Sequence, residues 1–117
     1  MVAKSPLVGV FAALLAVACS RTPEPAQVAA LAAAAPSLLS QAVNGEIERS
    51  QWPAGIAGLE PEHVRVAPEG LYVVLSSVGV EEHGLFVARA PSFAASPVTD
   101  PSYTALGQGV FSYHVKG

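Results

Sequence analysis

The chain has 117 residues, enough for one domain, and 51% of them are hydrophobic while 13% are charged. This composition excludes wholesale disorder, and a net charge of −3 with scattered basic residues gives no electrostatic footprint for nucleic acid. The single cysteine, Cys19, excludes an intramolecular disulfide, so the domain must be stabilised by its apolar core.

The first residues have the pattern of an export signal. Lys4 precedes Leu7–Ala18, an uncharged apolar run of twelve residues. A membrane-spanning helix needs roughly 20 apolar residues, whereas the apolar region of a signal peptide needs about 7–15. We therefore expect residues 1–18 to be a signal peptide that is removed. Lys4 is the only charged side chain lost with it, which leaves five basic against nine acidic side chains.

The end of this run, Leu15-Ala16-Val17-Ala18-Cys19, resembles the lipobox of bacterial lipoproteins. In that family the cysteine thiol receives a diacylglyceryl group and the chain is cut just before the cysteine. The resemblance implies lipidation of Cys19 and membrane anchoring in the cell envelope. Because Ser20 is not acidic, it also implies the outer membrane, where the cell has one. The family usually has Leu where Ala16 stands, and Ala16-Val17-Ala18 also fits an ordinary secretory cleavage site, so plain secretion remains an alternative.

Two helices are predicted after the cysteine. Residues 19–27 are proline-rich and are expected to form a tether, with a globular domain over 28–117. The Ala-rich Val28–Ala35 is predicted to be helical and to stop at Pro36, with a tether as the alternative, because so short a helix is marginal in water without tertiary contacts.

A second, amphipathic helix is predicted over Ser37–Ser50. Its apolar residues recur every three to four positions, and we expect Leu39, Val43 and Ile47 to cover one face of a sheet. The alternative, a partner-binding stripe, is the less common role of such a face.

From residue 63 the apolar period changes to two, which is typical of strands. A type I turn is predicted at Ala67–Gly70, another turn over Val78–Gly84 and a long loop over Ala90–Pro101. The predicted strands are His63–Val66, Leu71–Ser76, Leu85–Arg89 and Val110–Val115. The fold class expected is therefore α+β, with N-terminal helices packed on an antiparallel sheet of three to five strands. On the last strand, Phe111, Tyr113 and Val115 should face the core.

The second half of the chain also resembles small uncharacterised bacterial proteins, and this resemblance implies no activity. It is carried by Trp52-Pro53, Leu59-x-Pro61, Gly70-Leu71-Tyr72, Gly84-Leu85-Phe86, Asp100-Pro101-Ser102-Tyr103 and Gly109-Val110-Phe111.

The histidines and acidic residues show no motif for a metal or a cofactor. None of His63, His83 and His114 is paired with another at a helical spacing. Glu81-Glu82-His83 is expected to be a solvated turn, since adjacent residues on a turn cannot all face one ion. The rings of His63 and His114 could meet across the sheet, although exposed or hydrogen-bonded states are commoner. We expect no metal and no cofactor.

Nucleophile motifs are missing from the sequence as well. There is no Gly-x-Ser-x-Gly elbow, and the only cysteine is assigned to lipid. We therefore predict no catalytic residues.

The candidate binding residues lie in and after the Pro-rich loop: Phe93, Asp100 and Tyr103. Asp100 is also expected to cap a short turn or helix over Pro101–Leu106. The strand Val110–Val115 is a second candidate, as a sheet edge that accepts a partner strand.

The function expected from the sequence is that of an envelope lipoprotein with a noncatalytic binding or structural domain. Its partners would be the membrane, through lipid on Cys19, and an envelope protein, with no nucleic acid. The alternative is a small hydrolase or metal-dependent enzyme with a site that no motif reveals.

Overall fold

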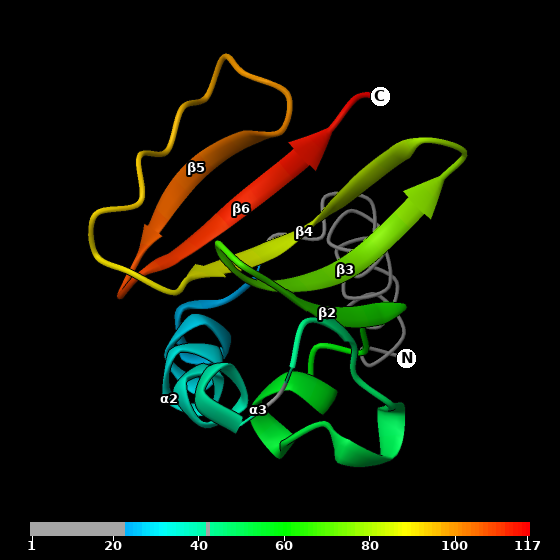
Figure 1. Cartoon of the computed structure of the whole chain (residues 1–117), viewed down its shortest axis with the longest axis vertical. Helices are drawn as coiled ribbons and strands as arrows, with labels where there is room; N and C mark the ends of the chain where they lie inside the picture. The colour runs from blue at the N-terminus through cyan, green and yellow to red at the C-terminus, as the bar shows by residue number, and fades with distance from the viewer. Residues whose placement is uncertain (1–22, 42) are drawn as a thin grey trace, which may run out of the picture.

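The computed structural model describes residues 23–41 and 43–117, so the predicted export signal, Cys19 and the start of the predicted tether lie outside the described residues. The elements in chain order are α2 (Pro25–Gln41), β1 (Gly45–Glu46), the 3-10 turn η1 (Arg49–Gln51), α3 (Ala54–Ala57), β2 (His63–Ala67), β3 (Gly70–Val78), β4 (Glu81–Ala88), β5 (Ser102–Gly107) and β6 (Val110–Val115). Figure 1 shows a twisted sheet with α2 and α3 on one side and a long loop reaching β5.

The sheet has six antiparallel strands in the order β1-β2-β3-β4-β6-β5. Two-residue turns join β2 to β3 and β3 to β4, and the loop of residues 89–101 then carries the chain to the outer strand β5. The chain returns to β6 through Gln108 and Gly109, whose φ angles are 57° and 78°. Positive φ at both positions matches the twist of a two-residue hairpin.

Local features of the sequence explain where α2 begins and which of its sides is buried. Pro25 is its first residue, where a missing N–H costs nothing. The side-chain oxygen of Gln27 accepts the backbone N–H of Glu24 at 2.9 Å, which is half of a capping box. The buried residues Val28, Leu31 and Ala35 lie on one stripe of the helix.

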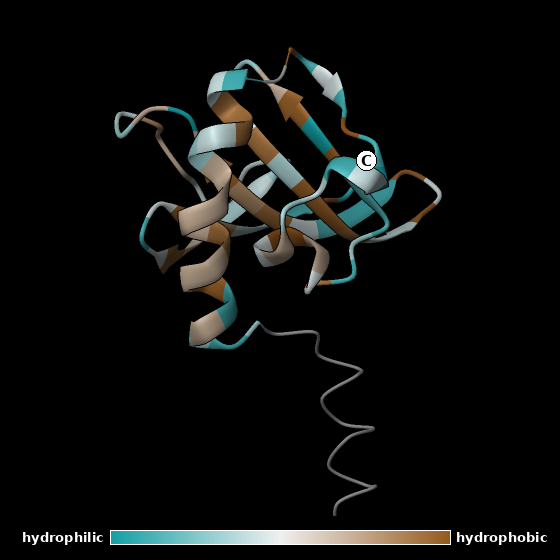
Figure 2. Cartoon of the chain, turned by 90° about the horizontal axis from the view of Figure 1, so that it is seen from below, coloured by the Kyte–Doolittle hydropathy of each residue, from teal (hydrophilic) through white to brown (hydrophobic). Residues whose placement is uncertain are grey.

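That stripe covers one face of the sheet. The apolar core between helix and sheet contains Val64, Val66, Leu71, Val73, Leu75, Leu85, Val87 and Val110 from the strands. Figure 2 shows α2 in front of these hydrophobic strands. The core also includes Ile56 of α3, which is fully buried.

The opposite face of the sheet has its own cluster, made of aromatic rings, and no helix of residues 23–41 or 43–117 covers it. Its buried members are Tyr72, Phe86 and Tyr113, and the surrounding, partly buried residues include Phe93, Tyr103, Phe111 and Val115. Of the three residues expected to face the core, Tyr113 is buried, whereas Phe111 and Val115 are only partly buried, and all three face this second cluster and not the helix.

The predicted fold class is wrong. The described residues form one six-stranded sheet with one main helix, instead of several N-terminal helices on three to five strands. The missed strands are β1, which has only two residues, and β5, which the sequence analysis assigned to a turn or helix after Asp100.

The predicted helix over Ser37–Ser50 is also wrong. Helix α2 ends at Gln41, and Val43 beyond it is 85% exposed. Ile47 is buried, but in the segment after β1. Pro36 lies inside α2 with its side chain exposed, so burial of Val28, Leu31 and Ala35 outweighs the hydrogen bond that proline removes. Residues 25–27, expected as tether, already belong to this helix.

The four predicted strands are confirmed as parts of β2, β3, β4 and β6, and the loop over Ala90–Pro101 is present. The predicted turn over Val78–Gly84 is too long, because β3 continues to Val78 and β4 already begins at Glu81. Strand β6 lies between β4 and β5 and is therefore not an edge.

Candidate functional site

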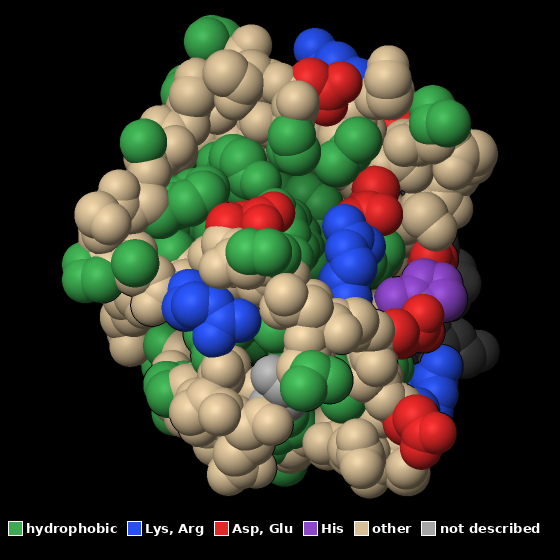
Figure 3. Space-filling view, in the orientation of Figure 1, with side chains coloured by type: hydrophobic (Ala, Val, Ile, Leu, Met, Phe, Trp, Pro, Cys, Tyr) green, Lys and Arg blue, Asp and Glu red, His purple; other side chains and the backbone are tan. Residues whose placement is uncertain are grey.

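Six rings form what we call the aromatic face: Tyr72, Phe86, Phe93, Tyr103, Phe111 and Tyr113. Phe86 lies at its centre, with ring centroids 4.8 Å from Phe93 and 5.2 Å from Tyr103. Phe93 and Tyr103 meet edge to face at 5.0 Å. Figure 3 shows hydrophobic side chains gathered in a hollow on this side of the molecule, with acidic and basic side chains at its rim.

The loop that carries Phe93 is tied to the sheet by hydrogen bonds. The backbone N–H of Tyr103 donates to the carbonyl of Ser96 at 2.8 Å. The carboxylate of Asp100 accepts the backbone N–H groups of Lys116 at 2.9 Å and of Gly117 at 3.2 Å. Asp100 thus fixes the loop to the end of the chain instead of capping a helix.

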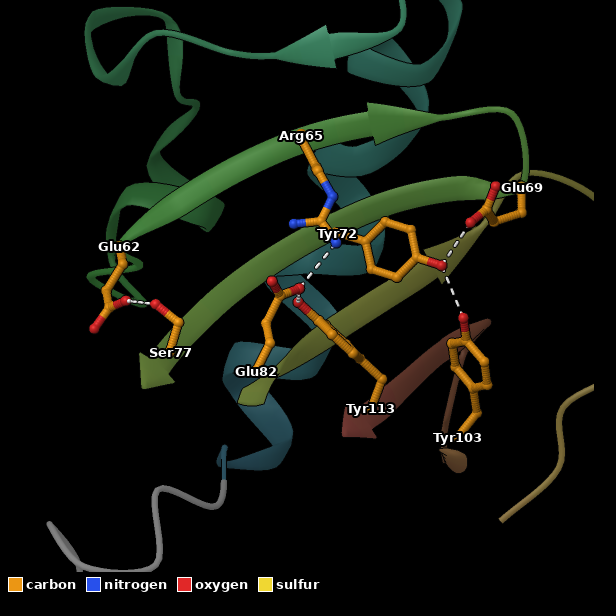
Figure 4. A network of polar contacts seen from close by, with 8 residues as sticks. All are labelled: Glu62, Arg65, Glu69, Tyr72, Ser77, Glu82, Tyr103 and Tyr113. Atoms are coloured by element: carbon orange, nitrogen blue, oxygen red, sulfur yellow. Dashed lines mark hydrogen bonds and ion pairs between the residues drawn. The ribbon is translucent and has the colours of Figure 1, made fainter. Parts of the chain in front are cut away.

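A chain of three oxygen atoms runs along the rim of the aromatic face (Figure 4). The hydroxyl of Tyr72 donates to Glu69 at 2.7 Å, and the hydroxyls of Tyr72 and Tyr103 are 2.7 Å apart. Because the one proton of Tyr72 goes to Glu69, Tyr103 must be the donor to Tyr72. The oxygen of Tyr103 can still accept a hydrogen bond from a ligand.

A second polar group lies across the same face. The carboxylate of Glu82 accepts hydrogen bonds from Arg65 at 2.9 Å and from Tyr113 at 2.6 Å. The guanidinium of Arg65 also lies over the ring of Tyr72, 4.7 Å from its centroid. These contacts join β2, β3, β4 and β6 through side chains.

The electrostatics of these groups oppose proton transfer. Burial, followed by the hydrogen bond to Glu82, raises the pKa of Tyr113, and burial with the Tyr103 and Glu69 contacts raises the pKa of Tyr72. Burial alone would raise the pKa of Glu82, but hydrogen bonds from Arg65 and Tyr113 outweigh it and lower that pKa. The tyrosines therefore stay protonated and Glu82 stays ionised at neutral pH.

Burial acts to lower the pKa of Arg65, and the hydrogen bond and charge of Glu82 outweigh that effect and raise it. Among the described residues, no buried side-chain nitrogen or oxygen lacks a hydrogen-bond partner. The hydrogen-bonding groups buried in this network are thus already satisfied.

The structure brings together two of the three predicted binding residues, Phe93 and Tyr103, and assigns Asp100 to the loop anchor. Sequence reasoning missed Glu69, Arg65 and Glu82. Arg65 and Glu82 lie on different strands and meet only through strand pairing, and so no local motif could have indicated the contact.

His63 and His114 are each hydrogen-bonded to a carboxylate, which is the kind of state expected to be commoner than a contact between their rings. The ring of His114 stacks on that of His83, with centroids 4.0 Å apart, and not on His63. His63 instead contacts Glu46 at 3.1 Å. Glu81, expected in a turn, lies on β4 with one carboxylate oxygen 2.9 Å from His114 Nε2.

A separate pocket lies between the end of α2 and β1. It is lined by Leu38, Gln41, Val43, Glu46, Ile47 and Gln51. Glu46 is the only ionisable group in this lining, so the pocket offers no convergent chemistry.

Comparison with family models, with curated proteins and with solved structures finds no match to this chain. Within residues 23–41 and 43–117, no helix combines the length and the apolar character needed to cross a membrane.

Proposed function

We propose that the chain is a lipid-anchored envelope protein whose domain binds a partner without catalysis, and that the aromatic face is its binding surface. The anchor rests on the lipobox-like Leu15–Cys19 segment. The observation that carries the binding role is a sheet face lined with aromatic rings, with Phe93, Tyr103 and Phe111 partly exposed and no helix over it in the described part of the chain.

Partly exposed aromatic rings beside a few polar groups are typical of binding surfaces. Aromatic side chains contribute most of the energy in many interfaces because they offer a large apolar area with few rotatable bonds. Here the rings are held by one another and by the loop, so little conformational freedom is lost on binding.

The charges favour an envelope protein segment that combines apolar side chains with a basic one. Glu69 accepts the Tyr72 hydroxyl, and the three ion pairs among the described residues do not include it. A basic side chain can pair with Glu69, and a donor can reach the oxygen of Tyr103. A net charge of about −4 after signal removal agrees with a basic partner.

Photo-crosslinking from two matched alanines tests this proposal. Ala94 is exposed beside Phe93, whereas Ala57 is exposed at the end of α3 on the helix side. A crosslinking residue at position 94 of the full chain, expressed in its own membranes, should give a discrete adduct that position 57 does not give. Glu69→Gln should weaken the adduct at position 94, because the variant loses the charge while keeping an acceptor for Tyr72.

Equal crosslinking from positions 94 and 57, or no adduct from position 94, would contradict the aromatic face as the binding surface. An adduct unchanged by Glu69→Gln would contradict the basic character of the partner.

A further inference from the structure

Three metal-ligating side chains lie together where β4 and β6 run side by side. His83 on β4 is the direct cross-strand partner of His114 on β6, so both side chains leave the same face of the sheet. Glu81 precedes His83 by two residues in the strand, and the alternation of side chains places it on that face as well. Their ligand atoms all lie within 4.8 Å of one another.

The spacing is close to that of a metal site. Ligand atoms at about 2.1 Å from a tetrahedral ion are roughly 3.4 Å apart, so the atoms here need to close by roughly 1.4 Å at most. Glu81 and His83 are exposed and His114 is 28% exposed. Rotation of exposed side chains can supply this closure while the strands stay in register.

The contacts now present compete only weakly with a metal. The rings of His83 and His114 stack at 4.0 Å and 14°, and Glu81 pairs with His114 at the surface. A solvent-exposed ion pair of this kind contributes little to stability, so its replacement by metal–ligand bonds is favourable.

We propose that Glu81, His83 and His114 bind one divalent transition-metal ion of the Zn²⁺ type. Two imidazole nitrogens and one carboxylate oxygen are a donor set that Zn²⁺ uses, whereas Mg²⁺ and Ca²⁺ prefer oxygen ligands alone. The position at the surface leaves a fourth coordination position open to water or to a side chain of another molecule. The site lies on the opposite face of the sheet from the aromatic face and is independent of the proposed binding role.

The chain provides a matched control. His63 contacts the carboxylate of Glu46 at 3.1 Å, with both side chains exposed, so it reproduces the surface histidine–carboxylate pair. Within the described residues, Glu81, His83 and His114 are the one group of three that could hold an ion, and His63 is outside it.

The test uses the full chain in detergent, carrying Cys19→Ala because a free thiol is itself a zinc ligand, and no histidine tag. After removal of metal with a chelator, equilibrium dialysis against Zn²⁺ should show saturable binding of one ion per chain. His83→Ala and His114→Ala should each weaken binding at least about tenfold, while His63→Ala should leave it unchanged. In nuclear magnetic resonance spectra, Zn²⁺ should shift the ring signals of His83 and His114 and not those of His63.

Several results would contradict the proposed metal site. These are a lack of saturable Zn²⁺ uptake, equal uptake by wild type and His83→Ala, or an equal loss in His63→Ala. Binding of Mg²⁺ as tight as that of Zn²⁺ would refute the donor-set argument. Circular dichroism of each variant confirms that a loss of binding is not a loss of folding.

Discussion

The carboxylate of Glu82 is the acceptor on which two side chains, Arg65 and Tyr113, converge beside the aromatic face. Arg65 in turn lies over Tyr72. The side chain of Glu82 is 21% exposed, so these hydrogen bonds are partly shielded from water. A charged acceptor in such a position forms stronger hydrogen bonds than a neutral one.

Glu82→Gln is therefore expected to destabilise the domain by roughly 1–2 kcal/mol at neutral pH. The pKa of Glu82 is lowered in the folded state, so the unfolded state binds its proton first as the pH falls. The stability that Glu82 contributes is present above the unfolded carboxyl pKa of about 4.3 and is lost as the pH falls through the lower, folded value. Thermal melts of both proteins at several pH values should show the difference shrinking in acid.

Glu62→Gln is the matched control for this experiment. Glu62 is exposed and accepts a single hydrogen bond, from Ser77 at 2.8 Å. Its replacement should change stability by less than about 0.5 kcal/mol at every pH. An equal loss of stability in both variants would show that the contacts of Glu82 with Arg65 and Tyr113 contribute no more than the surface contact of Glu62.

At the scale of the elements, α2 packs on one face of the sheet. The residues that it buries there lie earlier in the chain than the predicted stripe of Leu39, Val43 and Ile47. Almost every residue from Val28 to Ala35 is apolar, so the residues that face the sheet differ little from those that face water. The three-to-four-residue apolar spacing after Ser37 is clearer and therefore predicts a separate helix there. Pro36 predicts a helix end, but α2 continues through it to Gln41.

Leu31→Ala and Val43→Ala separate the two assignments. Leu31, a residue of α2, is fully buried in the core between the helix and the sheet, whereas Val43 is 85% exposed. Leu31→Ala should cost about 2–5 kcal/mol because it opens a cavity, and Val43→Ala should cost less than about 0.5 kcal/mol. Chemical denaturation measures both. A large loss for Val43→Ala would restore the predicted helix over Ser37–Ser50.

The strands could be predicted where local signals were strong. The alternation at His63–Val66 and the turn after Ala67 identify β2 and the start of β3 without tertiary information. Strand β5 was missed because most of its exposed residues, Thr104, Ala105 and Gly107, are polar or small and give no apolar alternation. Gln108-Gly109, which precedes β6, is nevertheless a hairpin signal.

The candidate sites were harder to predict than the strands, because their residues meet only through strand order and register and not through local sequence. Phe93 and Tyr103 could be named because aromatic residues in a loop are unusual, but their contact with Phe86 depends on the order of strands β4, β6 and β5. The pairing of His83 with His114 depends on register across residues far apart in the chain. Neither leaves a local motif.

At the scale of the whole molecule, the proposed lipid anchor is joined to the domain by a short stretch of chain that leads into α2. Five residues, 20–24, separate Cys19 from the first residue of α2. Even fully extended, these residues span at most about 3.6 Å each, or roughly 18 Å. A lipid on Cys19 would thus hold the domain near the membrane surface, where its partner would be another protein of that membrane.

Lipidation itself is tested by metabolic labelling with a fatty acid analogue. The wild-type chain should incorporate the label and fractionate with membranes, because two or three acyl chains on one terminus bind firmly where a single chain does not. Cys19→Ala should lose the label, because it has no thiol to accept the diacylglyceryl group. Ala18 and Ser20 flank the thiol, and Ser20→Ala, as a matched control, should keep the label and the membrane association of the wild type. Equal labelling of wild type and Cys19→Ala, or a wild-type protein that is released in soluble form, would favour ordinary secretory cleavage after Ala16-Val17-Ala18.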